Sequence, residues 1–230
     1  MNRREELAAN LADVQQAIAD VCRTLNRELP TLIVVTKTKP VSDVDILASL
    51  GVTDVGENRD QDAGPKRDAC LSPELTWHAI GQLQTNKAKS VAQWADVVHS
   101  VDRPDLVKAL GKATVSRTTA LSVLIQVNLD DQPQEHRGGC LPNDVLALAA
   151  QIAQISSLDI RGVMGVAPLG GDPADAFRRL AKVHNELMRV YPGATWMSAG
   201  MSDDYVPALE NGATHLRIGS SILGERASRG

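Results

Sequence analysis

A lysine that follows a predicted buried strand is the first candidate for chemistry in this sequence. Lys37 comes just after the apolar run Leu32-Ile33-Val34-Val35, whose β-branched residues predict such a strand. An amine in this position is expected to lose solvation, which favours its neutral, nucleophilic form, and repulsion from Lys39 acts in the same direction. A neutral lysine in a cleft can condense with an aldehyde to form an imine. The alternative is a solvated lysine that only closes the strand.

Two segments near the C-terminal end of the sequence are suited to binding a phosphate group. They are Ser198-Ala199-Gly200-Met201-Ser202 and Arg217-Ile218-Gly219-Ser220-Ser221. Glycine allows the backbone to approach a phosphate closely, and serine hydroxyls and backbone N–H groups can donate hydrogen bonds to its oxygens. Closed α/β barrels often bind phosphate in the loops after strands seven and eight, which these segments would form. Ordinary turns rich in Gly and Ser are the alternative.

Arg217 lies within the last predicted strand. We expect it inside the mouth of a barrel or against the neighbouring helices. It would either form a structural ion pair, with Glu57 or Asp102, or lie beside a cofactor ring. The histidines do not share the spacing of metal ligands, so no metal site is predicted. Two of them, His136 and His184, are predicted to be solvated.

The elements that must position these residues alternate between strands and helices. An amphipathic helix is predicted over 4–26, and further helices follow most of the strands. Alternation of this kind predicts a parallel sheet, and eight units predict a closed (β/α)8 TIM barrel with an extra N-terminal helix, forming one domain over 1–230. A doubly wound open sheet is the alternative. The predicted strands cover 32–35, 52–55, 77–80, 97–102, 122–127, 160–164, 195–198 and 214–218.

Composition limits the class of protein. The net charge of −4 comes with no block of Lys or Arg, so no nucleic-acid partner is expected. Aromatic residues make up 3% of the chain, so its core must be built from smaller aliphatic side chains. Cys22, Cys70 and Cys140 are scattered, which favours a reducing compartment without disulfides. There is no long apolar run, so we expect a cytoplasmic protein that does not span a membrane.

Several motifs, taken in this order, make the chain similar to a known family. It resembles the pyridoxal-phosphate homeostasis proteins (YggS/PROSC type) over nearly its whole length. This resemblance implies a barrel like the N-terminal domain of alanine racemase, without that enzyme's C-terminal β domain. The motifs are Val34-Val35-Thr36-Lys37-Thr38-Lys39-Pro40, Gly56-Glu57-Asn58, Trp77-His78-Ala79-Ile80-Gly81-Gln82-Leu83-Gln84-Thr85-Asn86-Lys87, Val127-Asn128, Arg161-Gly162-Val163-Met164, Gly200-Met201-Ser202-Asp203-Asp204 and Arg217-Ile218-Gly219.

The resemblance also implies a site for pyridoxal 5'-phosphate (PLP). Lys37 would hold PLP covalently as an internal aldimine, Asn58 would lie near the ring, and Arg217 would face the pyridine nitrogen. The residues implied around the phosphate are Ser198, Gly200, Met201, Ser202, Gly219 and Ser220. The chain departs from the family pattern at 58–62, which is unusually charged, and at 135–139, where a lysine is often found in the family.

The implied function is to carry or buffer this form of vitamin B6, and to hand it to recipients such as PLP-dependent apoenzymes. Arginine cannot accept a proton from the ring nitrogen, so carbanion stabilisation should be weak and amino-acid turnover small. The alternatives are a PLP-dependent racemase or lyase, with Tyr205 as a possible acid or base, and a lysine Schiff-base aldolase without PLP. Absence of the β domain removes one dimer interface, so a monomer is expected.

Overall fold

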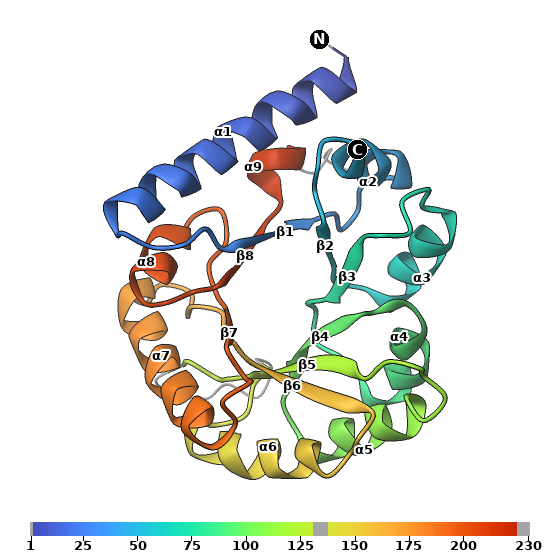
Figure 1. Cartoon of the computed structure of the whole chain (residues 1–230), viewed down its shortest axis with the longest axis vertical. Coiled ribbons are helices and arrows are strands. Elements are labelled where there is room, and N and C mark those ends of the chain that lie inside the picture. The colour runs from blue at the N-terminus through green and yellow to red at the C-terminus, as the bar shows by residue number, and fades with distance from the viewer. Residues whose placement is uncertain (1, 131–137, 225–230) are drawn as a thin grey trace.

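A closed barrel of parallel strands forms the centre of the molecule. The computed structural model describes residues 2–130 and 138–224. Eight strands pair in chain order and β8 closes the ring on β1, as Figure 1 shows, which confirms the predicted TIM barrel and excludes the open sheet. The strands are β1 (Thr31–Val35), β2 (Asp54–Glu57), β3 (Thr76–Ala79), β4 (Val97–Val101), β5 (Leu121–Gln126), β6 (Leu158–Met164), β7 (Trp196–Ser198) and β8 (His215–Ile218).

Helices surround this ring and cover its outer face (Figure 1). The first of them is the predicted extra helix, and it packs beside the last (Figure 1). It begins with a capping box in which Asn2 and Glu5 bond each other's backbone N–H groups. The helices are α1 (Arg3–Thr24), α2 (Val41–Ser49), α3 (Asp60–Ala69), α4 (Ala88–Trp94), α5 (Pro104–Ala113), α6 (Val145–Ala153), α7 (Pro173–Val190), α8 (Tyr205–Glu210) and α9 (Ser220–Leu223), with 3-10 turns at Thr85–Lys87 and Pro142–Asp144.

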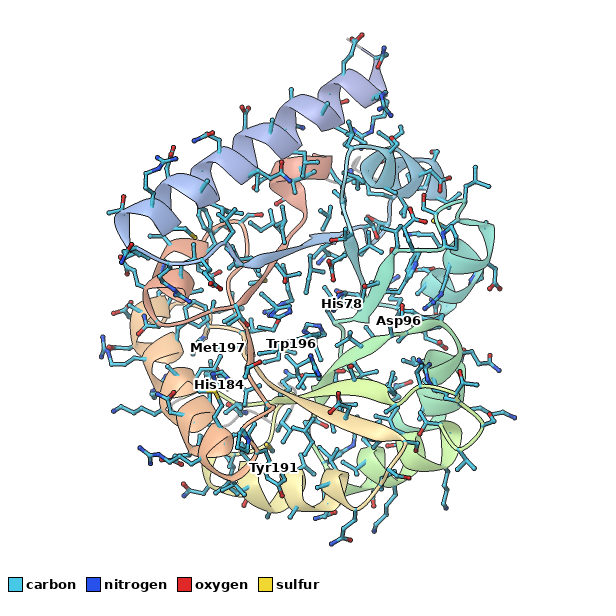
Figure 2. The ribbon with its side chains drawn as sticks, viewed as in Figure 1. His78, Asp96, His184, Tyr191, Trp196 and Met197 are labelled. Carbon is cyan, nitrogen blue, oxygen red and sulfur yellow. The ribbon has the colours of Figure 1, made fainter. Side chains whose placement is uncertain are left out.

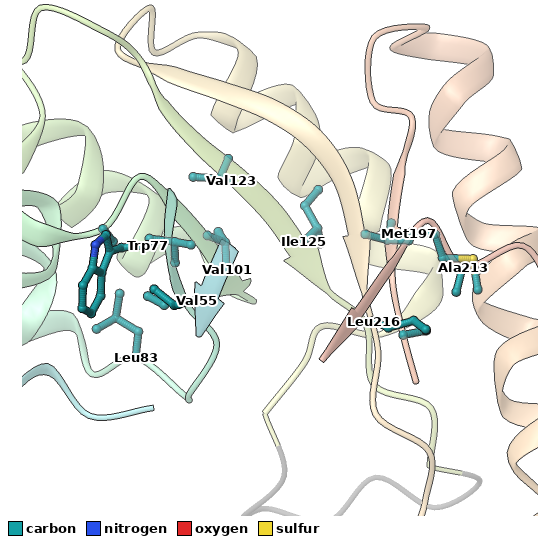
Figure 3. Packing of buried hydrophobic residues seen from close by; sticks show 14 of the residues in the cluster. Val55, Trp77, Leu83, Val101, Val123, Ile125, Met197, Ala213 and Leu216 are labelled. Carbon is teal, nitrogen blue, oxygen red and sulfur yellow. The ribbon is translucent and has the colours of Figure 1, made fainter. Parts of the chain in front are cut away.

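The apolar core is divided by the barrel wall. The larger part lies between strands and helices, and Figure 3 shows groups of it around Trp77 and Met197. A smaller cluster of Val97, Leu124 and Met164 lies apart from it, and alternation along the strands places it inside the barrel. Much of the remaining interior is polar, which is unusual for a barrel filled by aliphatic layers.

The structure corrects several predicted boundaries. The second strand runs over Asp54–Glu57 instead of 52–55, because its pairing with β3 continues to Glu57. The helical segment between β5 and β6 begins as a 3-10 turn at Pro142 and is α-helical only from Val145. Helix α9 was not predicted, since four residues are too few to show a helical period.

The described helices also bear on membrane insertion. None of those within 2–130 and 138–224 combines the length and apolarity that a bilayer crossing requires.

Candidate functional site

Lys37 lies in a tight turn at the C-terminal end of β1. The backbone N–H of Lys39 donates to the carbonyl of Thr36 at 3.1 Å, and Thr38 adopts a left-handed φ of 66°. A β-branched residue is rarely found in that conformation, and such strain is common at functional sites. The Lys37 side chain is exposed, so the predicted loss of solvation is wrong for this structure. The turn carries Lys37 past the buried end of the strand.

A buried polar cluster holds the main chain just before this turn. Thr36 donates from its hydroxyl to Glu57 Oε1 at 2.7 Å. Lys66, on α3, donates from Nζ to the Thr36 carbonyl at 2.9 Å and to Glu57 Oε1. Glu57 is 1% exposed, and its Oε2 has no hydrogen-bond partner among the described residues. Lys66 was not predicted from the sequence. The available signal was a lysine nine residues after Glu57, on the helix that follows the strand ending in this carboxylate.

The two serine-glycine segments meet at the same edge of the barrel as Lys37. Because β8 pairs with β1, Gly219 packs against Val35, and a side-chain carbon at Gly219 would lie 3.0 Å from the Val35 carbonyl oxygen. The segments also touch each other, since the hydroxyls of Ser202 and Ser220 are 3.2 Å apart. The predicted phosphate loops and the lysine turn therefore form one continuous rim.

Gly200 is required at this rim for two reasons. Its φ is +92°, and a side-chain carbon would lie 2.7 Å from Cβ of Ala208 and 2.9 Å from Leu216. We expect Gly200→Ala to lower the free energy of unfolding by about 1–3 kcal/mol through strain and crowding. Chemical denaturation measures this, with Gly193→Ala as the matched control because Gly193 has open space around it. Equal stability of the two variants would contradict the assignment.

Arg217 is buried inside the barrel without a carboxylate partner among the described residues. Its side chain donates to Ser198 Oγ at 2.6 Å and to the Gly165 carbonyl at 2.9 Å. Burial lowers its pKa to about 10, so it stays cationic at neutral pH. The predicted alternative of an ion pair with Glu57 or Asp102 is wrong, because these carboxylates pair with Lys66 and Arg103. A buried cation of this kind suits an anionic or hydrogen-bond-accepting ligand.

The structure places Ser198 among buried polar side chains. Its hydroxyl is fully buried, and it bonds Arg217 and also His99, whose Nδ1 is 3.0 Å away. The chain of contacts continues from His99 Nε2 to His78 Nδ1 at 2.8 Å, and from His78 Nε2 to Asp54 Oδ1 at 2.9 Å. Figure 2 shows His78 within the ring of strands. Sequence reasoning missed this chain, although Asp54, His78 and His99 all lie in predicted strands or beside them.

The other predicted residues lie at or near the rim. Asn58 and Met201 are exposed, and Asn58 packs so closely on Gly81 that a side-chain carbon there would lie 2.2 Å from the Asn58 carbonyl oxygen. Of the segment 135–139, residues 135–137 lie outside the described residues. Gly139 donates its N–H to Asp102 Oδ2 at 3.2 Å. The prediction that His136 is solvated concerns one of these residues that the structure does not describe.

His184 and His215 are both buried, and the prediction that His184 is solvated is wrong. His184 lies between the barrel and α7 (Figure 2) and bonds the Ala194 carbonyl at 2.8 Å. Its place on the inner face of an amphipathic helix explains the burial. His215 lies against the ring of Trp196 inside the barrel. Burial, followed by the positive charges nearby, lowers the pKa of His215 to about 4.

The lowered pKa of His215 predicts a loss of stability in acid. The unfolded chain binds a proton at His215 below about pH 6.5, whereas the native protein does so only near the lowered pKa of about 4. Lowering the pH between these values therefore favours unfolding, by about 1.4 kcal/mol per pH unit. His215→Gln should make the dependence shallower by that amount in denaturation curves from pH 7 to pH 4. An unchanged slope would contradict a neutral His215.

Together these groups can hold a small aldehyde that carries an anionic group. Lys37 supplies an amine at the rim, and the glycine turns leave backbone within reach of a phosphate. Arg217 supplies a fixed positive charge deeper in the barrel. The residues present therefore fit a ligand of the PLP type.

Comparison with known proteins agrees with this geometry. The family model described as "Alanine racemase, N-terminal domain" matches residues 8–227. A pyridoxal phosphate homeostasis protein of Corynebacterium glutamicum is 42% identical over 202 residues, covering 85% of this chain and 90% of that protein. One from Mycobacterium tuberculosis is 36% identical over 249 residues, covering 99% of this chain and 96% of that protein.

Solved structures show the same similarity. PipY of Synechococcus elongatus without PLP is 31% identical, with a TM-score of 0.83 over 95% of this chain and 100% of that one. PipY with PLP bound is 33% identical, with a TM-score of 0.76 over 90% of this chain and 100% of that one. The alanine racemase of Corynebacterium glutamicum is 12% identical at a TM-score of 0.74, covering 99% of this chain and 62% of that one, which is a likeness of fold.

Proposed function

Because this chain belongs to the family of the alanine racemase N-terminal domain, we propose that it binds PLP and serves in the homeostasis of this vitamer. The observation that carries the proposal is the shared rim, where the Lys37 turn lies beside the Gly219 turn with Arg217 buried below. We propose one PLP-binding domain over 1–230.

Lys37 is the residue proposed to bind PLP covalently. Its neutral amine forms a C–N bond to the aldehyde carbon, and the aldehyde oxygen leaves as water together with two hydrogens from the amine. The product is a Schiff base that borohydride reduces to a stable secondary amine. The strained turn at Thr38 supports this role, because it fixes the backbone from which Lys37 extends.

The remaining contacts are proposed from the family resemblance, and the positions of these residues at or below the rim support them. The phosphate is placed at Gly200, Met201, Ser202, Gly219 and Ser220, with Asn58 near the ring. Arg217 is placed at the pyridine nitrogen, where it donates a hydrogen bond and cannot accept a proton. We propose that Ser198 acts through Arg217 instead of touching the phosphate, since its hydroxyl is already bonded on both sides.

The proposed role is to carry or buffer PLP with little amino-acid turnover. PLP supplies an electron sink when its ring nitrogen is protonated, and an arginine at that nitrogen opposes protonation. Of the two tyrosines in the sequence, Tyr191 follows α7 at the opposite end of the barrel from Lys37. Tyr205 lines a cavity with Asn10 and Asp13 of α1 and with Ser202, Ile218 and Ser221. The position of Tyr191 does not support a role as the acid or base of a racemase or lyase at Lys37.

Delivery of PLP to apoenzymes, a cytoplasmic location and a monomeric state complete the proposal. Three free cysteines are consistent with a reducing compartment. Light scattering of the purified protein tests the monomer.

An absorbance spectrum with and without borohydride tests the central proposal. The purified protein, loaded with PLP, should show imine absorbance, and reduction should fix one PLP per chain. Mass spectrometry of peptides should then locate the modification on Lys37. A protein that takes up no PLP would contradict the proposed function and favour aldolase chemistry at the same lysine.

A further inference from the structure

Part of the polar interior of the barrel forms a chain of hydrogen bonds that ends on Arg217. Asp54, His78, His99 and Ser198 are its other members, contributed by four different strands, and each contact is between 2.6 and 3.0 Å. His78, His99 and Ser198 have no exposed surface. Asp54, at the far end from Arg217, reaches toward solvent with 16% of its side chain exposed.

The chemistry of the two ends fixes the direction of every bond. Arginine can only donate, so Ser198 Oγ accepts from Arg217. The Ser198 hydrogen then has His99 Nδ1 as its one acceptor among the described residues, so His99 accepts there and carries its proton on Nε2. That proton points to His78 Nδ1, which leaves the proton of His78 on Nε2, directed at Asp54 Oδ1.

The opposite direction fails at both ends. It would place a lone pair of a neutral His78 against the Asp54 carboxylate, or require a second proton on His78. It would also leave the Ser198 hydroxyl hydrogen without an acceptor in the part of the chain that the structure describes. Burial raises the pKa of Asp54, but hydrogen bonds from His78 and Thr53 outweigh it and lower the pKa, which keeps Asp54 an acceptor. Burial is the largest cause that lowers the pKa of His99 well below its usual value. Both observations agree with a neutral His99 ring and with Asp54 as the final acceptor.

We propose that Asp54, His78, His99 and Ser198 are positioning residues that orient the Arg217 guanidinium toward the ligand and hold its two anchored N–H groups in place. The inference rests on the proposed function, in which Arg217 contacts PLP. Ser198 Oγ and the Gly165 carbonyl hold Nη1 and Nη2 of Arg217, which leaves its remaining N–H donors available to a ligand. A guanidinium with free rotation would lose this preorganisation.

The first test measures the tautomers in the protein without PLP. Nitrogen-15 NMR of the imidazole rings should find both His78 and His99 neutral, with the proton on Nε2. A proton on Nδ1 of either ring would overturn the proposal. This arm does not depend on PLP binding or on any variant.

The second test compares release of PLP from variants of His99. In His99→Leu the chain is broken, and release should be about tenfold faster than in the wild type. His99→Gln keeps a donor and an acceptor on one side chain and should restore most of the wild-type rate. His184→Gln, a buried histidine outside the chain, is the matched control and should release PLP at the wild-type rate.

The outcomes separate the inference from the proposed function. A wild type that binds no PLP defeats the proposed function whatever the tautomers are. A wild type that holds PLP on Lys37, while His99→Leu releases it no faster, overturns the positioning role alone. If His99→Leu does not fold, the tautomers of the rings and the comparison of His99→Gln with the wild type still test the positioning role.

Discussion

Lys37→Ala should carry no PLP that borohydride can fix, because no other amine is expected to reach the aldehyde from the same rim. The imine absorbance should vanish, and the number of PLP molecules fixed per chain should fall from one to zero. Any PLP that remains would be held only by the phosphate loops and Arg217, and it should be lost on gel filtration. Spectra before and after reduction, followed by mass spectrometry, measure both effects.

Lys39→Ala is the matched control for this substitution. Lys39 lies two residues further along, and its Nζ donates to the Leu223 carbonyl at 2.8 Å, so it is held against α9. This variant should be labelled on Lys37 like the wild type. Labelling of Lys37→Ala at Lys39 would mean that the site selects an aldehyde near the rim without selecting Lys37. Unchanged labelling of both variants would place the covalent bond elsewhere.

Lys66→Met should lower the free energy of unfolding by about 3–5 kcal/mol, the loss expected when one partner of a buried ion pair is removed. Within 2–130 and 138–224, Glu57 would be left as a buried carboxylate with the Thr36 hydroxyl as its one hydrogen-bond partner. The Thr36 carbonyl would also lose its hydrogen bond from Lys66. Urea denaturation at pH 7 measures the change.

Two further variants show whether the effect comes from the buried charge. Glu57→Gln combined with Lys66→Met removes both charges and should recover most of the lost stability. Lys89→Met, at an exposed position on α4, should change stability by no more than about 0.5 kcal/mol. A Lys66→Met protein as stable as Lys89→Met would show that the pair contributes nothing.

Because the pair anchors Thr36, Lys66→Met should also slow the labelling of Lys37.

The fold could be predicted because each unit of the barrel has a local signature. Short β-branched runs such as Leu32–Val35, which lie in β1, alternate with amphipathic segments such as 173–190, which form α7. Boundaries were less certain where pairing decides them. Gly56 resembles a strand end in sequence, yet it lies inside β2 because the neighbouring strands bond on both sides.

The candidate site was predictable only in part. Lys37 and the two glycine-serine segments follow strands, so their common location could be inferred from the rule that strand ends of a barrel share one rim. The solvation of Lys37 could not, because it depends on a turn that lifts the side chain beyond the buried strand. The partners of Arg217 could not be predicted either. Ser198 belongs to β7 and Gly165 follows β6, so both contacts depend on how the strands pack together.

The sequence alone determined the period of each element, the number of strands, and which reactive or hydrogen-bonding residues end the strands. These features depend on neighbours along the chain. The tertiary structure decided which polar groups meet inside the barrel. Ser198 and His99 are 99 positions apart, and their contact depends on closure of the ring. Whether a buried Arg217 finds a carboxylate or a serine depends on strand register, because a shift of one residue turns every side chain to the opposite face of the wall.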